Sequence, residues 1–322
     1  MDAPLVILCY HRVLPEAQKT GDGRPYFVRG TAVTQDRFAA QVRSLARHFE
    51  ILPESEVLAA LDGRRSLRRP SCWITFDDGY RDILDHAAPV LGSSRLPATV
   101  FVTSAVIEER GRSLPADRWY AVLHRATRRR GILGSGESEW RFDLDRTQDY
   151  ERLVDGPERR RYLRAEPREQ AMLLCHLSDA LGVGDSGTGD LYMQRDDLRR
   201  LVAQGLSVGG HGRTHRILSG LDEADAASEV RDPLRFLEEL GLSPRTFAYP
   251  DGACSPQVAD LTRAAGWSSG LALGNRQVAA GDDRFLLPRF LPSDDAQWVE
   301  KALLPALGRT VLPSGHGLAT PV

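Results

Sequence analysis

The sequence has 322 residues, of which 42% are hydrophobic and 27% are charged, and this composition is ordinary for a soluble globular protein. Its length allows one large α/β domain or two small ones. The formal net charge of -2 gives no general attraction for nucleic acid, and no stretch reaches the roughly 20 apolar residues of a membrane span.

The first residues and the cysteines bear on where the protein works. The apolar run from Pro4 to Cys9 is too short for the core of a signal peptide and lacks a basic lead. The four cysteines, at positions 9, 72, 175 and 254, form no CxxC pair. We therefore expect a cytoplasmic protein with reduced cysteines.

Short apolar runs alternate with amphipathic segments through the first hundred residues. The runs predict strands at 5–10, 51–52, 72–76 and 98–102, and helical spacing predicts helices at 38–49, at 54–61 and after Gly79. A loop containing Gly and Pro is expected between the first strand and Gly30.

Residues 105–191 break this pattern. They contain arginine runs at 128–130 and 159–161 and glycine-rich patches at 131–136 and 182–189, and several segments have helical spacing. This predicts a largely helical insertion that acts as a lid within a single catalytic domain spanning residues 1–322. Its tryptophans, Trp119 and Trp140, are candidates for a sugar-stacking platform, with Trp119 assigned to substrate binding.

The alternation resumes at Arg195. Helices are expected at 195–205, 222–240 and 255–265, with strands at 206–208, 246–249 and 269–273, and residues 305–322 are expected to form a loose tail. Such βα alternation favours parallel strands with helices outside, and in these folds the chemistry collects at the C-terminal ends of the strands.

Two adjacent carboxylates, Asp77 and Asp78, directly follow the strand predicted at 72–76, and Gly79 then permits a tight turn. Neighbouring residues at a strand end point in different directions, so one carboxylate can bind a metal ion while the other stays free as a base. An Asp-Asp-Gly sequence by itself would indicate no more than an acidic turn before a helix.

His211 and His215 lie four residues apart after another predicted strand. This spacing can bring two imidazoles within reach of one ion, and two histidines with one carboxylate leave open positions for water. An isolated pair would indicate two polar loop histidines. The two signals gain weight together, because both fall at the ends of predicted parallel strands.

In order along the chain, these segments resemble the motifs of the polysaccharide deacetylase, or NodB-homology, family. The resemblance lies in Thr75–Gly79, in the His211 and His215 pair, and in Phe247–Gly252. Residues 10–13 and 287–289 resemble the opening and closing segments of a bacterial branch. The resemblance covers roughly residues 4–104 and 192–292, and it implies a distorted (β/α)7-type barrel.

The resemblance also implies roles for individual residues. Asp78, His211 and His215 would hold the metal ion, and Asp77 would be the general base that activates water. The backbone N–H of Asp251 would stabilise the oxyanion formed at the acetamide carbonyl. Tyr249 and Pro250, beside it in the third motif, are assigned to substrate binding.

Two features depart from the family pattern. Many members carry an arginine where this chain has Ala248, and Arg289 is the candidate that would orient Asp77 instead. The late histidine that protonates the departing amine has no counterpart, because only His316 follows His215. His11 is one candidate for this general acid, Asp77 after it has taken up a proton is the other, and a second-shell role for His11 is the alternative.

The resulting prediction is a metal-dependent hydrolase that removes an N-acetyl group from an amino-sugar-containing small molecule, oligosaccharide or lipid-linked sugar. The cofactor is one divalent ion, with Zn2+ first and Co2+, Ni2+ or Fe2+ as alternatives. Hydrolysis of another amide, such as a cyclic imide or an N-formyl group, and a catalytically silent sugar-binding protein are the competing hypotheses.

Overall fold

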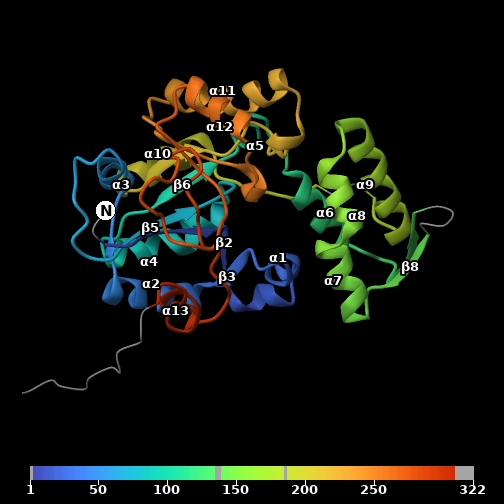
Figure 1. The fold of residues 1–322 in the computed structure, drawn as a ribbon. Coiled ribbons are helices and arrows are strands. Elements are labelled where there is room, and N and C mark those ends of the chain that lie inside the picture. The colour runs from blue at the N-terminus through green and yellow to red at the C-terminus, as the bar shows by residue number, and fades with distance from the viewer. Residues whose placement is uncertain (1–2, 135–138, 185–186, 309–322) are drawn as a thin grey trace, which may run out of the picture.

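The computed structural model describes residues 3–134, 139–184 and 187–308 (Figure 1). Its main sheet has seven strands in the order β1-β5-β6-β9-β10-β11, with β4 also paired to β5, and every one of these pairs is parallel. The strands are β1 (Leu5–Tyr10), β4 (Glu50–Ile51), β5 (Ser71–Phe76), β6 (Thr99–Val102), β9 (Ser207–Gly210), β10 (Thr246–Ala248) and β11 (Ser269–Leu271). The expected parallel strands are confirmed.

An extended segment around Leu287–Phe290 joins the two edge strands. The N–H of Leu287 donates to the carbonyl of Gly270 at 3.0 Å, beside β11, and the N–H of Phe290 donates to the carbonyl of Ile7 at 2.8 Å, in β1. This segment closes the sheet into the expected distorted barrel, and it carries Arg289 into the interior.

Helices surround the sheet, as Figure 1 shows. β1 and β5 are buried along their whole length, which explains why their sequences are continuous apolar runs and do not alternate. In α2, Phe38, Val42 and Leu45 form the buried face. Each such side chain contributes about 1.5–3 kcal/mol when it is removed from water. The helices on the barrel are α2 (Gln35–His48), α3 (Glu54–Leu61), α4 (Ala88–Ser93), α5 (Ser104–Glu108), α10 (Arg195–Ala203), α11 (Glu223–Glu239), α12 (Pro256–Ala264) and α13 (Leu304–Ala306).

The expectation of a loop up to Gly30 is wrong. This segment forms β2 (Arg12–Leu14), a short 3-10 turn, and α1 (Arg24–Arg29), and β2 pairs with β3 (Ala32–Thr34). Glycine at position 30 ends α1 in the left-handed conformation, with φ of 79°, so the residue that suggested a loop is a helix terminator. The tail also begins later than expected, because 305 and 306 belong to α13; residues 309–322 lie outside the described part of the chain.

The insertion contains α6 (Pro115–His124), α7 (Thr147–Asp155), α8 (Pro157–Arg164) and α9 (Pro167–Leu181), which lie together beside the barrel (Figure 1). It also contains an antiparallel hairpin that the sequence did not predict, formed by β7 (Arg130–Leu133) and β8 (Trp140–Asp143). The last residue of one arginine run, Arg130, and the first residues of a glycine-rich patch therefore lie in a strand. Across the described ranges, no helix has both the length and the apolar character needed to cross a membrane.

A buried carboxylate at the start of α3 gives the fold a pH-dependent stability. Glu54 is 5% exposed, and burial raises its pKa to about 7, although a hydrogen bond with Thr246 opposes the shift. The unfolded chain binds this proton with a pKa of 4.5, so the stability that Glu54 contributes is fully present below pH 4.5 and is lost as the pH rises through 7. The loss amounts to about 3 kcal/mol.

Replacing Glu54 with Gln should remove this dependence, because the amide stays neutral. We expect Glu54→Gln to unfold at a higher temperature than the wild type at pH 8, with little difference at pH 4.5. Thermal unfolding across this pH range tests the expectation, and parallel curves for the two proteins would contradict it.

Candidate metal centre

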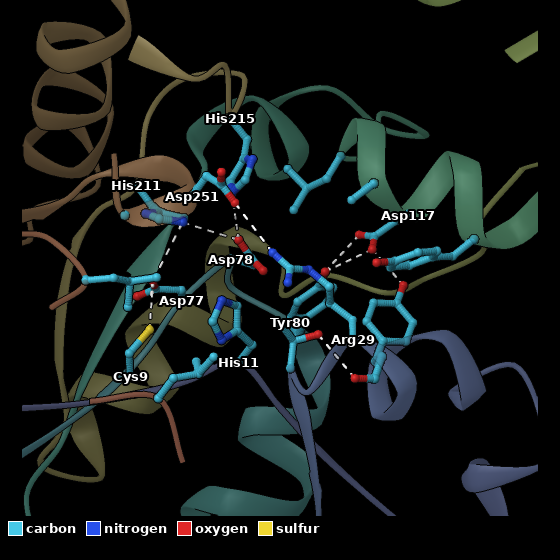
Figure 2. A pocket seen from close by; sticks show the side chains of 18 of the residues that line it. Cys9, His11, Arg29, Asp77, Asp78, Tyr80, Asp117, His211, His215 and Asp251 are labelled. Atoms are coloured by element: carbon cyan, nitrogen blue, oxygen red, sulfur yellow. Dashed lines mark hydrogen bonds and ion pairs between the residues drawn. The ribbon is translucent and has the colours of Figure 1, made fainter. Parts of the chain in front are cut away.

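Asp77 and Asp78 follow β5 in a turn that separates their side chains. Asp78 and Gly79 both have a backbone φ of 75°, in the left-handed region that residues other than glycine rarely adopt. Asp77 is directed toward Arg289. Figure 2 shows Asp78 directed toward the two histidines. The two carboxylates therefore have different surroundings, as the sequence predicted.

His211 directly follows β9, and its Nδ1 lies 2.8 Å from the carbonyl oxygen of Ala248. Since a carbonyl can only accept, Nδ1 carries the proton, and Nε2 of the neutral ring has a free lone pair. That lone pair faces Asp78.

His215 is held by its turn and by α11. It has φ of 64°, and the neighbouring Thr214 donates its N–H to Glu229 Oε2 at 2.9 Å and its hydroxyl to Oε1. Glu229 is buried on α11 and fixes the loop through these two hydrogen bonds with the neighbour of His215. No sequence motif singled out this residue.

Three potential ligand atoms converge at this point. Asp78 Oδ1 lies 3.3 Å from Nε2 of His211 and 3.2 Å from Nε2 of His215, and all three atoms lie within 4.8 Å of one another. Ligands of one tetrahedral ion with bonds of about 2.0–2.1 Å are separated by about 3.3 Å. Asp78 Oδ1 is also buried without a hydrogen bond among the described residues. A carboxylate oxygen and an imidazole lone pair repel each other unless a proton or a metal ion lies between them. The spacing and the donor types of this set fit a divalent metal.

Charge and burial act in opposite directions on the two carboxylates. Burial alone would raise the pKa of Asp77, but the charge and hydrogen bonds of Arg289 outweigh it and lower that pKa to about 2. Burial likewise opposes the shift at Asp78, whose pKa is held well below its usual range by His211 and His215. Both groups are therefore anions at neutral pH.

Arg289 lies where the closing segment enters the barrel and is fully buried. Its Nη1 and Nη2 donate to Oδ1 and Oδ2 of Asp77, each at 2.7 Å, and Nη1 also reaches the hydroxyl of Thr75 at 3.2 Å. The expected contact with Asp77 is confirmed. It also fits the departure at position 248, where Ala248 is fully buried and leaves the orienting position to Arg289.

Lysine cannot replace this fork of donors, because an ammonium group is a point charge on a flexible stem. We expect Arg289→Lys to lose about 1–3 kcal/mol of stability and at least tenfold in turnover, since Asp77 would no longer be held by two parallel hydrogen bonds. Arg276→Lys is the matched control: Arg276 forms a similar two-point pair with Asp282, but on the exposed surface. Equal effects of the two substitutions on unfolding and turnover would contradict the prediction.

The centre opens into a cavity of about 90 Å³, which is large enough for several water molecules. His11, at the end of β1, lines it, and its Nδ1 is buried with no hydrogen bond in the described ranges. Ligand-type atoms of Cys9, His11 and Asp77 lie within 4.8 Å of one another, and the Cys9 thiol donates to Asp77 Oδ2 at 3.3 Å. Asp251 also lines the cavity, with φ of 57°.

The three residues that the sequence assigned to substrate binding do not line the cavity. Trp119 is 2% exposed, donates its indole N–H to the carbonyl of Leu153 at 2.8 Å and packs on Tyr162, so it belongs to the core of the insertion. Tyr249 is fully buried and donates its hydroxyl to the carbonyl of Phe285 at 2.8 Å. Pro250 is buried as well. None of these three side chains lines the cavity.

The cavity wall opposite the histidines comes from segments without a recognisable motif. Arg29 ends α1, Asp117 lies on α6, and Arg159 lies on α8, and all three line the cavity. Figure 2 shows Arg29 and Asp117 on this side. Asp117 accepts from the hydroxyls of Tyr26 at 2.6 Å, Tyr80 at 2.9 Å and Tyr192, so it ties the insertion to the barrel.

The sequence model of the polysaccharide deacetylase family matches residues 64–269. The comparison with curated proteins finds no match. Among solved structures, the deacetylase PplD of Streptococcus pyogenes is 15% identical with a TM-score of 0.60, and the match covers 95% of this chain and 98% of that one. IcaB of Ammonifex degensii is 22% identical with a TM-score of 0.57, covering 94% and 96%. The BpsB deacetylase domain of Bordetella bronchiseptica is 13% identical with a TM-score of 0.53, covering 90% and 96%. At these identities the structural matches establish the fold.

Proposed function

Because the chain belongs to the polysaccharide deacetylase family, we propose that it is a metal-dependent enzyme that hydrolyses the N-acetyl group of an amino-sugar-containing substrate. The observation that carries this proposal is the convergence of Asp78, His211 and His215 around the unpaired Oδ1 of Asp78. Three ligands of this kind leave coordination positions open, which is the arrangement of a catalytic metal site.

We assign the metal-binding role to Asp78, His211 and His215. When bound, a divalent ion lowers the pKa of water and polarises the amide carbonyl. Two imidazoles and a carboxylate suit Zn2+ first, with Co2+, Ni2+ and Fe2+ as alternatives that metal analysis separates.

Asp77 is the proposed general base. Arg289 and the Cys9 thiol occupy three of the acceptor sites of its carboxylate and fix its orientation. Its low pKa keeps it ionised but makes it a weak base. It can accept a proton from water only because the pKa of that water is itself lowered.

The remaining steps need an oxyanion donor and a proton donor. We assign the first role to the backbone N–H of Asp251. As oxygen bonds to the carbonyl carbon and the C–N bond breaks, the departing nitrogen needs a proton. Asp77 can return the one it accepted, either directly or through His11, which lies beside it. The products are acetate and a free amine.

Acetate release tests the reaction class. The metal-loaded protein should release acetate from at least one N-acetylated amino sugar, offered as monosaccharide, oligosaccharide, sugar phosphate or nucleotide sugar. Cyclic imides and N-formyl sugars serve as the competing substrates. Turnover of those compounds without acetate release would replace the proposal, and binding without any turnover would favour a silent sugar-binding protein. The cytoplasmic location expected from the sequence stays a prediction.

A further inference from the structure

Arg159 is a buried cation whose Nε has no hydrogen-bond partner among the described residues. The residue is 7% exposed. Its contacts are an ion pair with Asp155, in which Nη1 lies 3.7 Å away, and stacking over the ring of Tyr120 at 5.0 Å. A buried guanidinium normally has acceptors for its five N–H donors. Arg159 lines the cavity, so its unmatched donors can bind a ligand there.

Arg29 adds a second cation to the same wall. Its Nη1 donates to Oδ2 of Asp155 at 3.0 Å, and its Nη2 lies 3.9 Å from Asp251 Oδ1 (Figure 2). Asp155 is thus shared between Arg29 and Arg159, and one carboxylate cannot saturate two guanidinium forks.

The carboxylate of Asp117 is not available as an acceptor for the guanidinium groups of Arg29 and Arg159. Its two oxygens already accept from the hydroxyls of Tyr26, Tyr80 and Tyr192. It lines the cavity as the centre of a closed hydrogen-bonded cluster, and the wall retains cationic donors beside it.

We propose that Arg159 and Arg29 bind an anionic group, a phosphate or a carboxylate, that the amino-sugar substrate carries close to its N-acetyl group. The arginines and Asp78 line one cavity of about 90 Å³, so the anion and the acyl group would belong to neighbouring parts of one molecule. The inference rests on the proposed deacetylase function for the reaction, but not for the binding of the anion. It defines the substrate class as anionic amino sugars and not neutral chitin-like chains.

The first test compares substrates at constant ionic strength. The panel holds N-acetylglucosamine and its neutral oligomers, N-acetylglucosamine phosphates, and N-acetylated amino sugars with a carboxylate. We expect the wild type to have a higher kcat/KM for an anionic substrate than for a neutral one. In Arg159→Gln, the ratio of kcat/KM for the anionic substrate to kcat/KM for the neutral substrate should fall by about 10- to 100-fold. Whether the phosphate or the carboxylate compound is preferred identifies the source of the anion.

Arg161→Gln is the matched control, because Arg161 lies on the same helix but is exposed and pairs with Glu169. It should leave the ratio as in the wild type. Equal kcat/KM for neutral and anionic substrates, or an unchanged ratio in Arg159→Gln, overturns the inference. Arg29→Gln is the second variant if Arg159→Gln does not fold, and the same outcomes apply to it.

The second test measures the affinity of the metal-loaded protein for inorganic phosphate by calorimetry. Wild type and Arg159→Gln have the same metal ligands, so a difference in the Kd for phosphate between them would be due to the loss of the Arg159 guanidinium. We expect Kd to rise at least tenfold in the variant, and equal Kd values overturn the proposal. If no N-acetyl sugar is turned over, the deacetylase function fails, while the phosphate measurement still decides the anion site.

Discussion

Substitution of Asp78 by Ala is expected to abolish both metal binding and turnover. The variant keeps His211 and His215 but loses the anionic ligand, whose Oδ1 lies 3.3 and 3.2 Å from the two Nε2 atoms. Two neutral imidazoles hold a divalent cation far more weakly than two imidazoles and a carboxylate. Because a bound metal supplies several kcal/mol of transition-state stabilisation, turnover should fall on the order of 1000-fold or more.

Elemental analysis after dialysis measures the first effect, and acetate release measures the second. Asp85→Ala is the control, since Asp85 is an exposed carboxylate on the segment that follows the same strand and pairs with Arg81. This control should retain the metal at wild-type stoichiometry. Should Asp78→Ala also retain one metal ion per chain, Asp78 is not a ligand.

The candidate metal centre could be predicted from the sequence because the end of each strand is marked by a local sequence pattern. Each strand of a parallel barrel is a short apolar run, and the residue after it must lie at the C-terminal edge of the sheet. Asp77 directly follows such a run and Asp78 comes next, while His211 lies three residues after Val208. No knowledge of side-chain packing is needed to bring these residues to one edge.

The opposite wall of the cavity could not be predicted in this way. Arg29 ends a helix in a segment that Gly30 made look like a loop, and Arg159 belongs to an arginine run in which its neighbours are exposed. Their approach to the cavity depends on how the insertion packs against the barrel. Glu229 is similarly hidden, because a carboxylate inside a long helix is ordinarily solvated.

The prediction that Trp119 binds substrate is wrong, although the sequence contains a signal for its burial. Trp119, Tyr120, Val122 and Leu123 follow helical spacing within α6 and are all buried. An aromatic residue on the apolar face of an amphipathic helix belongs to a core, and that periodicity outweighs its chemical suitability for stacking on sugars.

Substitution of Asp77 by Asn should separate metal binding from catalysis. The amide is nearly the same size as the carboxylate and leaves Asp78, His211 and His215 in place, so the metal content should stay at the wild-type level. An amide cannot accept a proton from water, and loss of a general base costs about 100- to 10,000-fold in turnover. Acetate release and metal analysis on the same sample test both parts of the expectation.

The substitution also disturbs a buried ion pair, and this effect has to be separated from the loss of the base. In Asp77→Asn, the amide NH2 group would face an N–H donor of Arg289, and the buried guanidinium would lose its anionic partner. We expect this change to lower the free energy of unfolding by about 3–5 kcal/mol. Asp82→Asn is the matched control, because Asp82 forms a buried pair with Arg12 at 2.8 Å but does not line the cavity. We expect both variants to unfold at lower temperature and only Asp77→Asn to lose turnover. A folded, metal-loaded Asp77→Asn protein whose turnover stays within a few-fold of the wild type would show that another group accepts the proton.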